Sequence, residues 1–257
     1  MNALASIGAA TLGFMAATGR IVIFALTALA AGMSPPFYLR QVLRQMLDIG
    51  YFSLPVVGLT AIFTGMVLAL QSYTGFSRFQ AESAIATVVV LSVTRELGPV
   101  IAGLMVAGRV GAAMAAEIGT MRVTDQIDAL TTLSTDPLRY LVMPRLMAGL
   151  ITLPLLVVIA GVIGVFGGYL VAIYKFAFTP VTYLDRTFHY LETSDVVSGL
   201  VKAAVFGFIV ALMGCYHGYN SRGGAQGVGQ ATTYAVVSAS ILILVFDYGI
   251  TQALFAR

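Results

Sequence analysis

Residues 84–106 read AIATVVVLSVTRELGPVIAGLMV, an apolar stretch long enough to cross a bilayer, with Arg95 and Glu96 side by side near its middle. A charge there costs about 2.5–3.5 kcal/mol on insertion scales, so such groups usually face a bundle interior or a wet cavity. Adjacent helix positions point about 100° apart, so the two side chains should not simply pair with each other. Pro99 leaves the carbonyl of Arg95 without its helical partner and favours a kink. This pattern indicates that a membrane protein handles something polar inside the bilayer.

The composition supports the same class of protein. Hydrophobic residues make up 59% of the 257-residue chain and charged residues 10%, whereas soluble domains carry about 25% charged residues. The mean hydropathy is +0.93. We therefore predict an all-α membrane protein whose residues 1–257 form a single domain. The net charge of +3 comes from loop arginines and not from a basic patch with interleaved aromatics, which excludes nucleic-acid binding.

Uncharged runs predict about five transmembrane helices. We place residues 1–48 outside this bundle, with 3–31 as a helix lying in the membrane interface and 37–48 as an amphipathic connector. Residues 3–31 are also just long enough to cross. The bundle occupies 49–257, with spans at about 50–73, 84–106, within 146–174, 196–217 and 231–254.

Polar segments separate the spans and set the orientation. Residues 117–145 are predicted as the main soluble loop and 175–195 as a second polar loop, while Lys202 is expected to snorkel from one end of its span. With the N-terminus inside, eight of the Lys and Arg residues outside mid-membrane fall on the cytoplasmic side and five on the other. The positive-inside rule therefore favours a cytoplasmic 117–145 loop.

A short helix is predicted at about 122–134 in this loop. Thr124 is its expected N-cap with Asp125 in the first turn, and Asp136-Pro137 is expected to end the element. One face is apolar, with Val123, Ile127, Leu130 and Leu133 or Ser134. Such a helix can dock onto a cytoplasmic partner or rest on the membrane surface, and the pattern favours neither.

Small residues recur at four-residue intervals in two spans. The rows are Gly103, Ala107, Gly111, Ala115 and Gly119, and then Ala160, Gly164, Gly168 and Ala172. Small residues let helix backbones approach closely in membranes. The rows therefore predict close packing within the chain or, as an alternative, a contact between subunits.

Motifs for catalysis are missing from the sequence. It contains no Gly-x-x-x-x-Gly-Lys-[Ser/Thr] phosphate loop, no Gly-x-Ser-x-Gly elbow and no His-Glu-x-x-His pair. Cys215 is the single cysteine, and His189 and His217 lack metal-ligand spacing. The N-terminus lacks a signal-peptide pattern. We expect no catalytic residues, no metal site and no cofactor held by this chain.

Several motifs together resemble one family of permeases. The runs are Arg95-Glu96-Leu97-Gly98-Pro99-Val100, Ala107-Gly108-Arg109, and 116–130 with Ala116-Glu117-Ile118-Gly119-Thr120-Met121-Arg122 followed by Val123-Thr124-Asp125-Gln126-Ile127-Asp128-Ala129-Leu130. Further matches are Asn2-Ala3-Leu4-Ala5-Ser6, Gly65-Met66-Val67-Leu68, Asp136-Pro137-Leu138-Arg139, Pro144-Arg145, Gly149, Leu153-Pro154-Leu155, Ala231-Thr232-Thr233 and Asp247. The chain resembles MlaE/YrbE-type permeases over nearly its whole length.

The resemblance implies a permease domain that forms a homodimer in the inner membrane of a Gram-negative bacterium. It implies an ABC-type transporter that moves glycerophospholipids between the inner and outer membranes and so maintains outer-membrane lipid asymmetry. The implied partners are a cytoplasmic ATPase like MlaF, which uses ATP and Mg, a STAS-domain protein like MlaB and a periplasmic hexamer of MCE-domain subunits like MlaD. In the family, the helix matching 122–134 couples the permease to the ATPase.

Two groups of site residues follow from the residues and the resemblance together. The expected lipid cavity comprises Leu68, Tyr73, Phe76, Phe79, Arg95, Glu96, Asp247 and Arg44. The expected ATPase-coupling residues are Glu117, Arg122, Asp125, Asp128 and Leu130. The aromatic residues are equally explained as an interfacial belt. Arg95 can meet a lipid phosphate or can pair structurally with a carboxylate on another helix, for which Asp247 or a neighbouring subunit's Glu96 is suitable.

Two other classes of function remain open on the residues alone. An ion-coupled secondary transporter would use Arg95, Glu96 and Asp247 as an ion or proton site and would need no ATPase. A passive assembly protein would anchor a periplasmic complex without a transport pathway of its own.

Overall fold

The protein is entirely helical in the part that the structure describes. In this computed structural model the described residues are 3–79, 81 and 84–255, and they contain no strand. Six segments among them are long and apolar enough to cross a membrane: Gly8–Gly32, Leu39–Phe76, Ile85–Val123, Leu138–Tyr174, Thr193–Tyr219 and Gly224–Leu254. The predicted all-α membrane fold is confirmed. Five of the segments contain the predicted spans, and the sixth is the N-terminal helix.

Three of the long segments (Leu39–Phe76, Ile85–Val123 and Leu138–Tyr174) are built from consecutive helices, and the other three are single helices. The first half of the chain contains α1 (Ala3–Gly32), α2 (Leu39–Ile49), η1 (Tyr51–Ser53), α3 (Leu54–Phe76), η2 (Ser77–Phe79), α4 (Ile85–Ser92), η4 (Val93–Leu97), α5 (Gly98–Val106), η5 (Ala107–Gly111) and α6 (Ala112–Val123). The second half contains α7 (Gln126–Thr132), η6 (Leu138–Val142), α8 (Met143–Tyr174), α9 (Pro180–Tyr190), α10 (Thr193–Tyr219) and α11 (Gly224–Phe255).

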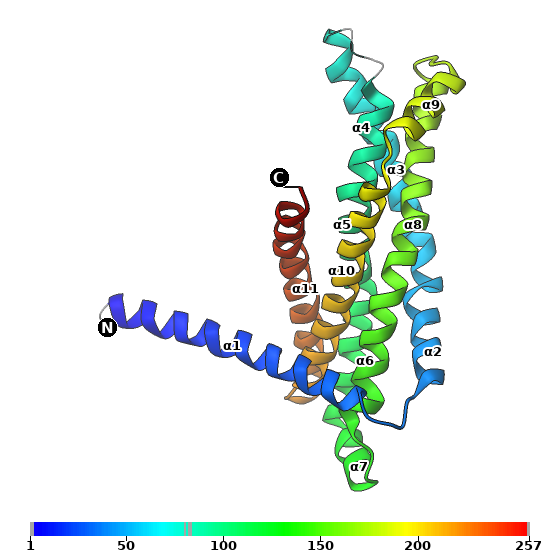
Figure 1. Ribbon diagram of the computed structural model, residues 1–257. Coiled ribbons are helices and arrows are strands. Elements are labelled where there is room, and N and C mark those ends of the chain that lie inside the picture. The colour runs from blue at the N-terminus through cyan, green and yellow to red at the C-terminus, as the bar shows by residue number, and fades with distance from the viewer. Residues whose placement is uncertain (1–2, 80, 82–83, 256–257) are drawn as a thin grey trace.

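Helix α10 lies at the centre of the bundle (Figure 1). It packs against α5 and α6 on one side, α8 on another and α11 on a third, while α3 packs on the far side of α8. Its buried side chains include Phe206, Val210 and Met213, which belong to the main hydrophobic core. The chain therefore buries its fourth predicted span most deeply and leaves parts of α3 and α11 on the outside.

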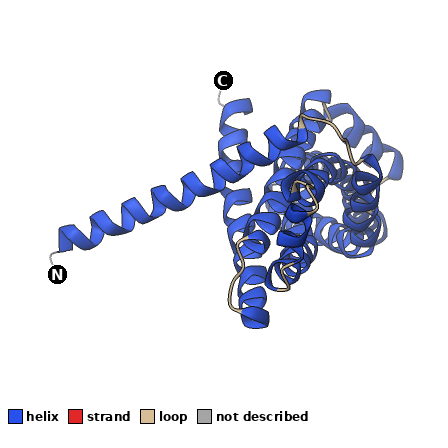
Figure 2. Ribbon diagram, turned by 90° about the horizontal axis from the view of Figure 1, so that it is seen from below, coloured by secondary structure: helices blue, strands red, loops and turns tan. Residues whose placement is uncertain are grey.

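Helix α1 runs across the other helices instead of along them, as Figures 1 and 2 both show. Phe24 packs edge-on against Tyr216 at a ring distance of 5.5 Å. Arg139 donates hydrogen bonds of 2.8 Å to the carbonyls of Ala31 and Pro35, which fixes the C-terminal end of α1 beside η6. The interfacial position of this helix stays a prediction, and α1 has the length and composition of a span.

The small-residue rows pack within the chain. Gly103 faces Phe206 and Ile243, and Gly111 faces Val210 of α10. In the other row, a Cβ atom on Gly164 would lie 3.3 Å from the carbonyl oxygen of Ala61 in α3. The rows let α5, α6 and α8 approach their neighbours closely, as the first of the two sequence interpretations predicted.

Two predicted loop boundaries are wrong. The helical rod that begins at α4 continues to Val123, so Glu117 and Arg122 belong to its last turns and not to a loop. The predicted polar loop 175–195 contains α9, whose Tyr183 and Thr187 are buried. In the first case, a helix that leaves the membrane carries charged residues without ending; in the second, a separate short helix lies between α8 and α10.

Candidate functional site: a charged cluster beside an apolar groove

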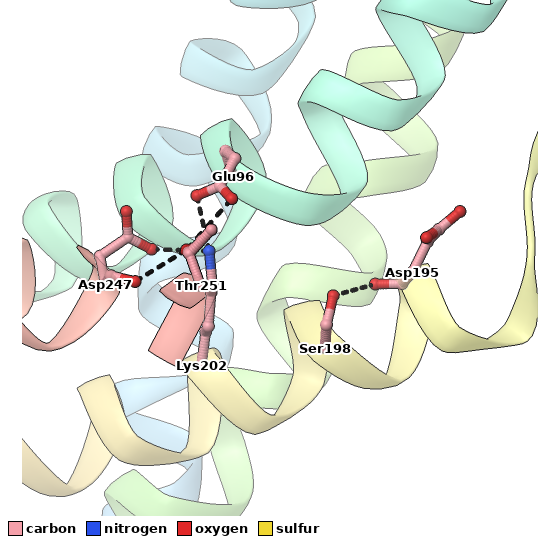
Figure 3. Close-up of polar contacts among 6 residues, drawn as sticks. All are labelled: Glu96, Asp195, Ser198, Lys202, Asp247 and Thr251. Atoms are coloured by element: carbon pink, nitrogen blue, oxygen red, sulfur yellow. Dashed lines mark hydrogen bonds and ion pairs between the residues drawn. The ribbon is translucent and has the colours of Figure 1, made fainter. Parts of the chain in front are cut away.

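A lysine and two carboxylates meet in the interior of the bundle (Figure 3). The Nζ atom of Lys202 on α10 lies 2.6 Å from Oε2 of Glu96 and 2.9 Å from Oδ1 of Asp247 on α11. The hydroxyl of Thr251 donates a hydrogen bond of 3.3 Å to the other oxygen of Glu96. We call Glu96, Lys202, Asp247 and Thr251 the charged cluster. Its residues come from three helical segments, which contain η4, α10 and α11.

Within the charged cluster, the lysine is buried and one carboxylate is partly exposed to solvent. The Lys202 side chain has no exposed surface, whereas that of Glu96 is 39% exposed. The Asp247 contact is an ion pair only, because its Oδ1 accepts no hydrogen bond from any described residue. Burying a charge costs several kcal/mol, which only a close counter-ion offsets. Two carboxylates therefore hold one buried ammonium, and Glu96 offers the cluster's most accessible charge.

Arg95, the neighbour of Glu96, forms a separate ion pair with α10. Its Nε donates a hydrogen bond of 2.7 Å to Oδ1 of Asp195, whose side chain is fully buried. The other oxygen of Asp195 accepts a hydrogen bond of 3.1 Å from the backbone N–H of Glu192. This second contact belongs to a capping box, so the carboxylate that receives Arg95 also fixes the start of α10.

Local helix geometry explains why both neighbours reach α10. Asp195 and Lys202 are seven residues apart, which places them on one face of the helix. On the opposing rod, Arg95 and Glu96 lie in the π-helical turn η4, where the N–H of Gly98 donates to the carbonyl of Val93. The predicted disturbance before Pro99 is this π-helical turn, a feature that is frequent at functional sites.

Two members of this arrangement differ from the prediction. Asp195 was expected in a loop but lies in the first turn of α10, and Lys202 was expected to snorkel to the membrane surface, which is wrong because its side chain is fully buried. Arg95 does pair with a carboxylate on another helix, as one interpretation expected, but that carboxylate is Asp195. A usable signal existed, because one otherwise apolar span carries the pair Arg95-Glu96 and two others carry a single charge each, Lys202 and Asp247.

An apolar groove runs along α3 and reaches the turn η4. Its volume is about 430 Å³, and Leu68, one of the predicted cavity residues, lines it. We call it the α3 groove, and its lining residues are Thr60, Phe63, Thr64, Val67, Leu68, Gln71 and Leu97. Leu97 directly follows Glu96 in η4, so this turn contributes one residue to the groove and the next to the charged cluster, with the two side chains pointing to different sides.

The other predicted cavity residues lie elsewhere. Tyr73 stacks on Phe176 with ring centroids 3.7 Å apart, which ties the end of α3 to the turn after α8. Phe76 is half-buried and packs against the cluster that contains Ala69 and Ile85. Arg44 is exposed on α2, at the opposite end of the same rod from Tyr73. The side chain of Phe79 lies outside the described residues.

The predicted coupling segment forms the tip of the molecule (Figure 1). The α7 helix is shorter than predicted, because Arg122 and Val123 end α6 and Leu133 follows the last residue of α7. Thr124 does not cap α7. Its hydroxyl donates to the carbonyl of Thr120, and Asp125 holds the N-cap position with a left-handed φ of 58°.

The end of the segment also differs from prediction. Asp136-Pro137 does not end α7 but begins the next rod, where the side chain of Asp136 accepts a hydrogen bond of 2.9 Å from the N–H of Leu138. Such a contact satisfies a donor at a helix start.

The five predicted coupling residues have different surroundings. Arg122 and Asp128 form an exposed ion pair of 2.7 Å, and Asp125 is exposed beside it. Glu117 pairs at 2.8 Å with the buried Arg145 of α8. Leu130 is half-buried and packs against the main core. Asp125 and Asp128 are therefore the exposed carboxylates of the tip, while Glu117 and Leu130 connect it to the bundle.

Comparisons with known proteins identify the family of this chain. A family model described as Permease MlaE matches residues 42–253. A "Probable ABC transporter permease protein" of Rickettsia felis is 61% identical over 99% of this chain and 98% of its own length. The "Intermembrane phospholipid transport system permease protein MlaE" of Haemophilus influenzae is 34% identical over 99% of this chain and 98% of its own length. The chloroplastic "Protein TRIGALACTOSYLDIACYLGLYCEROL 1" of Arabidopsis thaliana is 37% identical over 84% of this chain and 62% of its own length. This multi-pass membrane protein belongs to the MlaE permease family of ABC transporters.

Proposed function

We propose that this chain is the permease subunit of an ABC-type transporter that moves glycerophospholipids between the inner and outer membranes and so maintains outer-membrane lipid asymmetry. The observation that carries the proposal is the open apolar α3 groove, whose lining includes Leu97 of the same turn that carries Glu96. An apolar wall and a charged cluster on one helical segment together complement an amphiphile with long acyl chains and a polar head. The name of the Haemophilus relative supports the choice of phospholipid.

Two copies of the chain form the lipid cavity in this proposal. The α3 groove is an open wall in one chain, and Phe63 and Val67 on it are more than half exposed. Facing grooves from two copies would enclose an apolar chamber with a charged cluster from each copy. Five spans cannot form two equal inverted halves, so a symmetric transport pathway needs a second copy of the chain.

A partner ATPase powers the movement, since the sequence has no phosphate loop. The partners that we propose are this cytoplasmic ATPase, which uses ATP and Mg, a STAS-domain protein and a periplasmic MCE-domain hexamer. The protein would then be located in the bacterial inner membrane. Asp125 and Asp128 at the α7 tip form the ATPase-docking surface.

Reversing a charge at the tip tests this docking. We expect Asp128→Lys to reduce recovery of the ATPase in co-purification, because it removes the ion pair with Arg122 and places two cations side by side. An exposed pair contributes only about 0–1 kcal/mol to folding, so the chain itself should keep its thermal stability. Asp128→Asn is the matched control with an intermediate effect. Full recovery of the ATPase with the lysine variant would exclude this surface.

Blocking the α3 groove tests the proposed function. In proteoliposomes that contain the ATPase and the MCE-domain partner, Val67→Trp should lower ATP-dependent phospholipid transfer about tenfold or more, since tenfold in rate corresponds to only about 1.4 kcal/mol. Val67 lines the groove and is 53% exposed, so the indole fills it without entering the core. Val56→Trp adds the same bulk on α3 outside the groove lining and should transfer normally.

Glu96→Ala and Arg95→Ala complete this test. Both should slow transfer, because one removes the accessible carboxylate and the other removes the guanidinium paired with Asp195. If both variants assemble and transfer lipid at the wild-type rate, the proposed role of the charges is wrong. Transfer that needs no ATPase and follows a proton gradient would instead identify an ion-coupled transporter.

A further inference from the structure

Arg109 lies in the second π-helical turn of the helical rod Ile85–Val123. The first turn, η4, carries Arg95 and Glu96, and the second, η5, spans Ala107–Gly111. A π-helical turn holds an extra residue, and such turns are frequent at functional sites. The charged cluster contains Glu96 of η4, whereas η5 contributes no residue to it.

The guanidinium of Arg109 is bound at the break between α2 and α3. Its Nε and Nη2 atoms donate hydrogen bonds of 3.0 and 2.8 Å to the hydroxyl oxygen of Ser53, which is buried. Nη2 also donates to the carbonyl of Asp48 and makes a longer contact of 3.5 Å with the carbonyl of Ile49. One side chain therefore connects the rod Ile85–Val123 to the last turn of α2 and to η1.

The break favours a cationic donor because α2 ends there. The last carbonyls of a helix lack partners within the helix and carry the negative end of its dipole. The N–H of Ser53, which would reach Ile49 in a continuous α-helix, donates instead to the carbonyl of Gly50 at 3.0 Å. Pro55, in the first turn of α3, has no N–H to donate back across the break. Arg109 therefore supplies donors where the backbone hydrogen-bond ladder is interrupted.

Arg109 lies midway along the rod between the charged cluster and the α7 tip. At 1.5 Å per residue it is about 20 Å from Glu96 and about 21 Å from Val123, where the rod ends. On the other side of the contact, Ser53 directly precedes α3, which provides the α3 groove with its lining from Thr60 to Gln71. The side chain thus links the rod that leads to the proposed ATPase-docking surface with the start of the helix that forms the groove wall.

The α2–α3 break has the properties of a hinge. Hinges are a few residues at the ends of elements that absorb changes in φ and ψ, and residues 50–53 lie between two helices. Helix α3 also packs against α5 of the rod, but apolar contacts are non-directional, whereas hydrogen bonds require a narrow range of distance and angle. The guanidinium therefore fixes the position of this break relative to the rod.

We propose that Arg109 is a positioning residue for transport, which transmits movement of the α7 tip to the α3 groove by holding the α2–α3 break against the rod. The inference rests on the proposed function and adds the residue through which ATP hydrolysis by the partner changes the shape of the groove. Arg109 lines neither the groove nor the charged cluster, so it acts through α3. Coupling between distant sites is carried by hydrogen bonds and rigid elements in contact, and the rod, the guanidinium and the break form such a connection.

The amount of phospholipid transferred per ATP hydrolysed tests this role. Both rates are measured on the same proteoliposomes, which contain the ATPase and the MCE-domain partner. We expect Arg109→Gln to lower the ratio about fivefold while ATP hydrolysis continues, within the range by which residues between two sites change their coupling. Arg109→Lys should retain more of the ratio, because its ammonium keeps the charge but cannot bridge the serine and the carbonyls as a planar guanidinium does.

Ser53→Ala changes the same contact from the other side. It removes the hydroxyl acceptor and leaves the carbonyls of α2 to Arg109, so we expect a folded protein with a ratio lowered about twofold, the lower end of that range. If Arg109→Gln does not assemble, Arg109→Lys and Ser53→Ala decide the question. Wild-type ratios for both of these variants would overturn the inference.

Arg139 provides a matched control, because its guanidinium makes the same kind of contact elsewhere. It also lies in a π-helical turn, η6, and donates hydrogen bonds of 2.8 Å to the carbonyls of Ala31 and Pro35 at the end of α1. Arg139→Gln should lower the thermal stability, as Arg109→Gln does, but should leave the transfer per ATP unchanged. Equal loss of the ratio in both glutamine variants would show a general effect of removing a helix-end arginine and would overturn the inference.

The remaining outcomes separate this inference from the proposed function. If both glutamine variants lose stability and keep the wild-type ratio, Arg109 has only a structural role and the inference fails while the proposed function stands. If the wild-type complex hydrolyses ATP and transfers no phospholipid, the proposed function itself fails, and the inference that rests on it fails too.

Discussion

Lys202→Ala should abolish ATP-dependent lipid transfer and destabilise the protein more than any other single charge removal within the bundle. The lysine is fully buried and is the common partner of Glu96 and Asp247. Without it, two carboxylates would share one low-dielectric site with no cation in the charged cluster. Removing one partner of a buried ion pair costs about 3–5 kcal/mol, because the remaining charge loses its compensation. Thermal unfolding followed by size-exclusion chromatography in detergent measures the loss.

A compensating variant separates this effect from loss of packing. Lys202→Met combined with Glu96→Gln and Asp247→Asn keeps the side-chain volumes and removes all three charges. It should recover most of the thermal stability, since neutral replacements of buried pairs are often tolerated, but it should not recover transfer if the charges meet the lipid. Wild-type stability of Lys202→Ala would show that the charged cluster contributes nothing to the fold.

Gly207→Val should prevent the bundle from assembling, because no space exists for a side chain at this position. Gly207 of α10 faces Gly149 of α8, and a Cβ atom on Gly207 would overlap the carbonyl of Gly149. A Cβ on Gly149 would in turn lie 2.5 Å from the carbonyl oxygen of Gly207. Both obstacles are backbone atoms that cannot rotate away, so we expect destabilisation of about 3 kcal/mol or more. The yield of monodisperse protein is the measurement.

A glycine of α11 provides the control. A Cβ atom on Gly249 meets nothing within 4 Å, and alanine favours a helix over glycine by about 1 kcal/mol. Gly249→Ala should therefore fold at least as well as the wild type. If Gly207→Val is recovered in the same amount as the wild type and has the same melting temperature, the backbones of α8 and α10 are not in contact at Gly149 and Gly207.

The sequence alone determined the class of the protein and most of its helices. Uncharged runs of bilayer length identify spans because a backbone in hydrocarbon must satisfy its hydrogen bonds internally. Four-residue rows of small side chains identified the faces of α5, α6 and α8 that pack closely. The long motif around Arg95 and the 116–130 run indicated the permease family, which the match over 42–253 confirms.

Helix ends and α9 were harder to predict from sequence. Glu117 and Arg122 indicated a loop, although they lie in the last turns of a helix that extends beyond the apolar stretch. Thr124 was expected to cap α7, but its hydroxyl bonds within the preceding helix. Local sequence patterns cannot distinguish these cases, because a polar side chain between two helices can cap the start of the second or bond to a carbonyl of the first.

The pairing of charges was decided only by the tertiary structure. Arg95 and Glu96 are adjacent in the chain, yet one pairs with Asp195 and the other with Lys202. Both partners lie about a hundred positions away on one face of α10, and the choice depends on how α10 is rotated against the π-helical turn η4. Sequence shows which residues are charged, but the rotation of packed helices determines which charges meet. The physical reason is that a helix confines each side chain to a narrow range of directions, so ion pairs form only where two such directions converge.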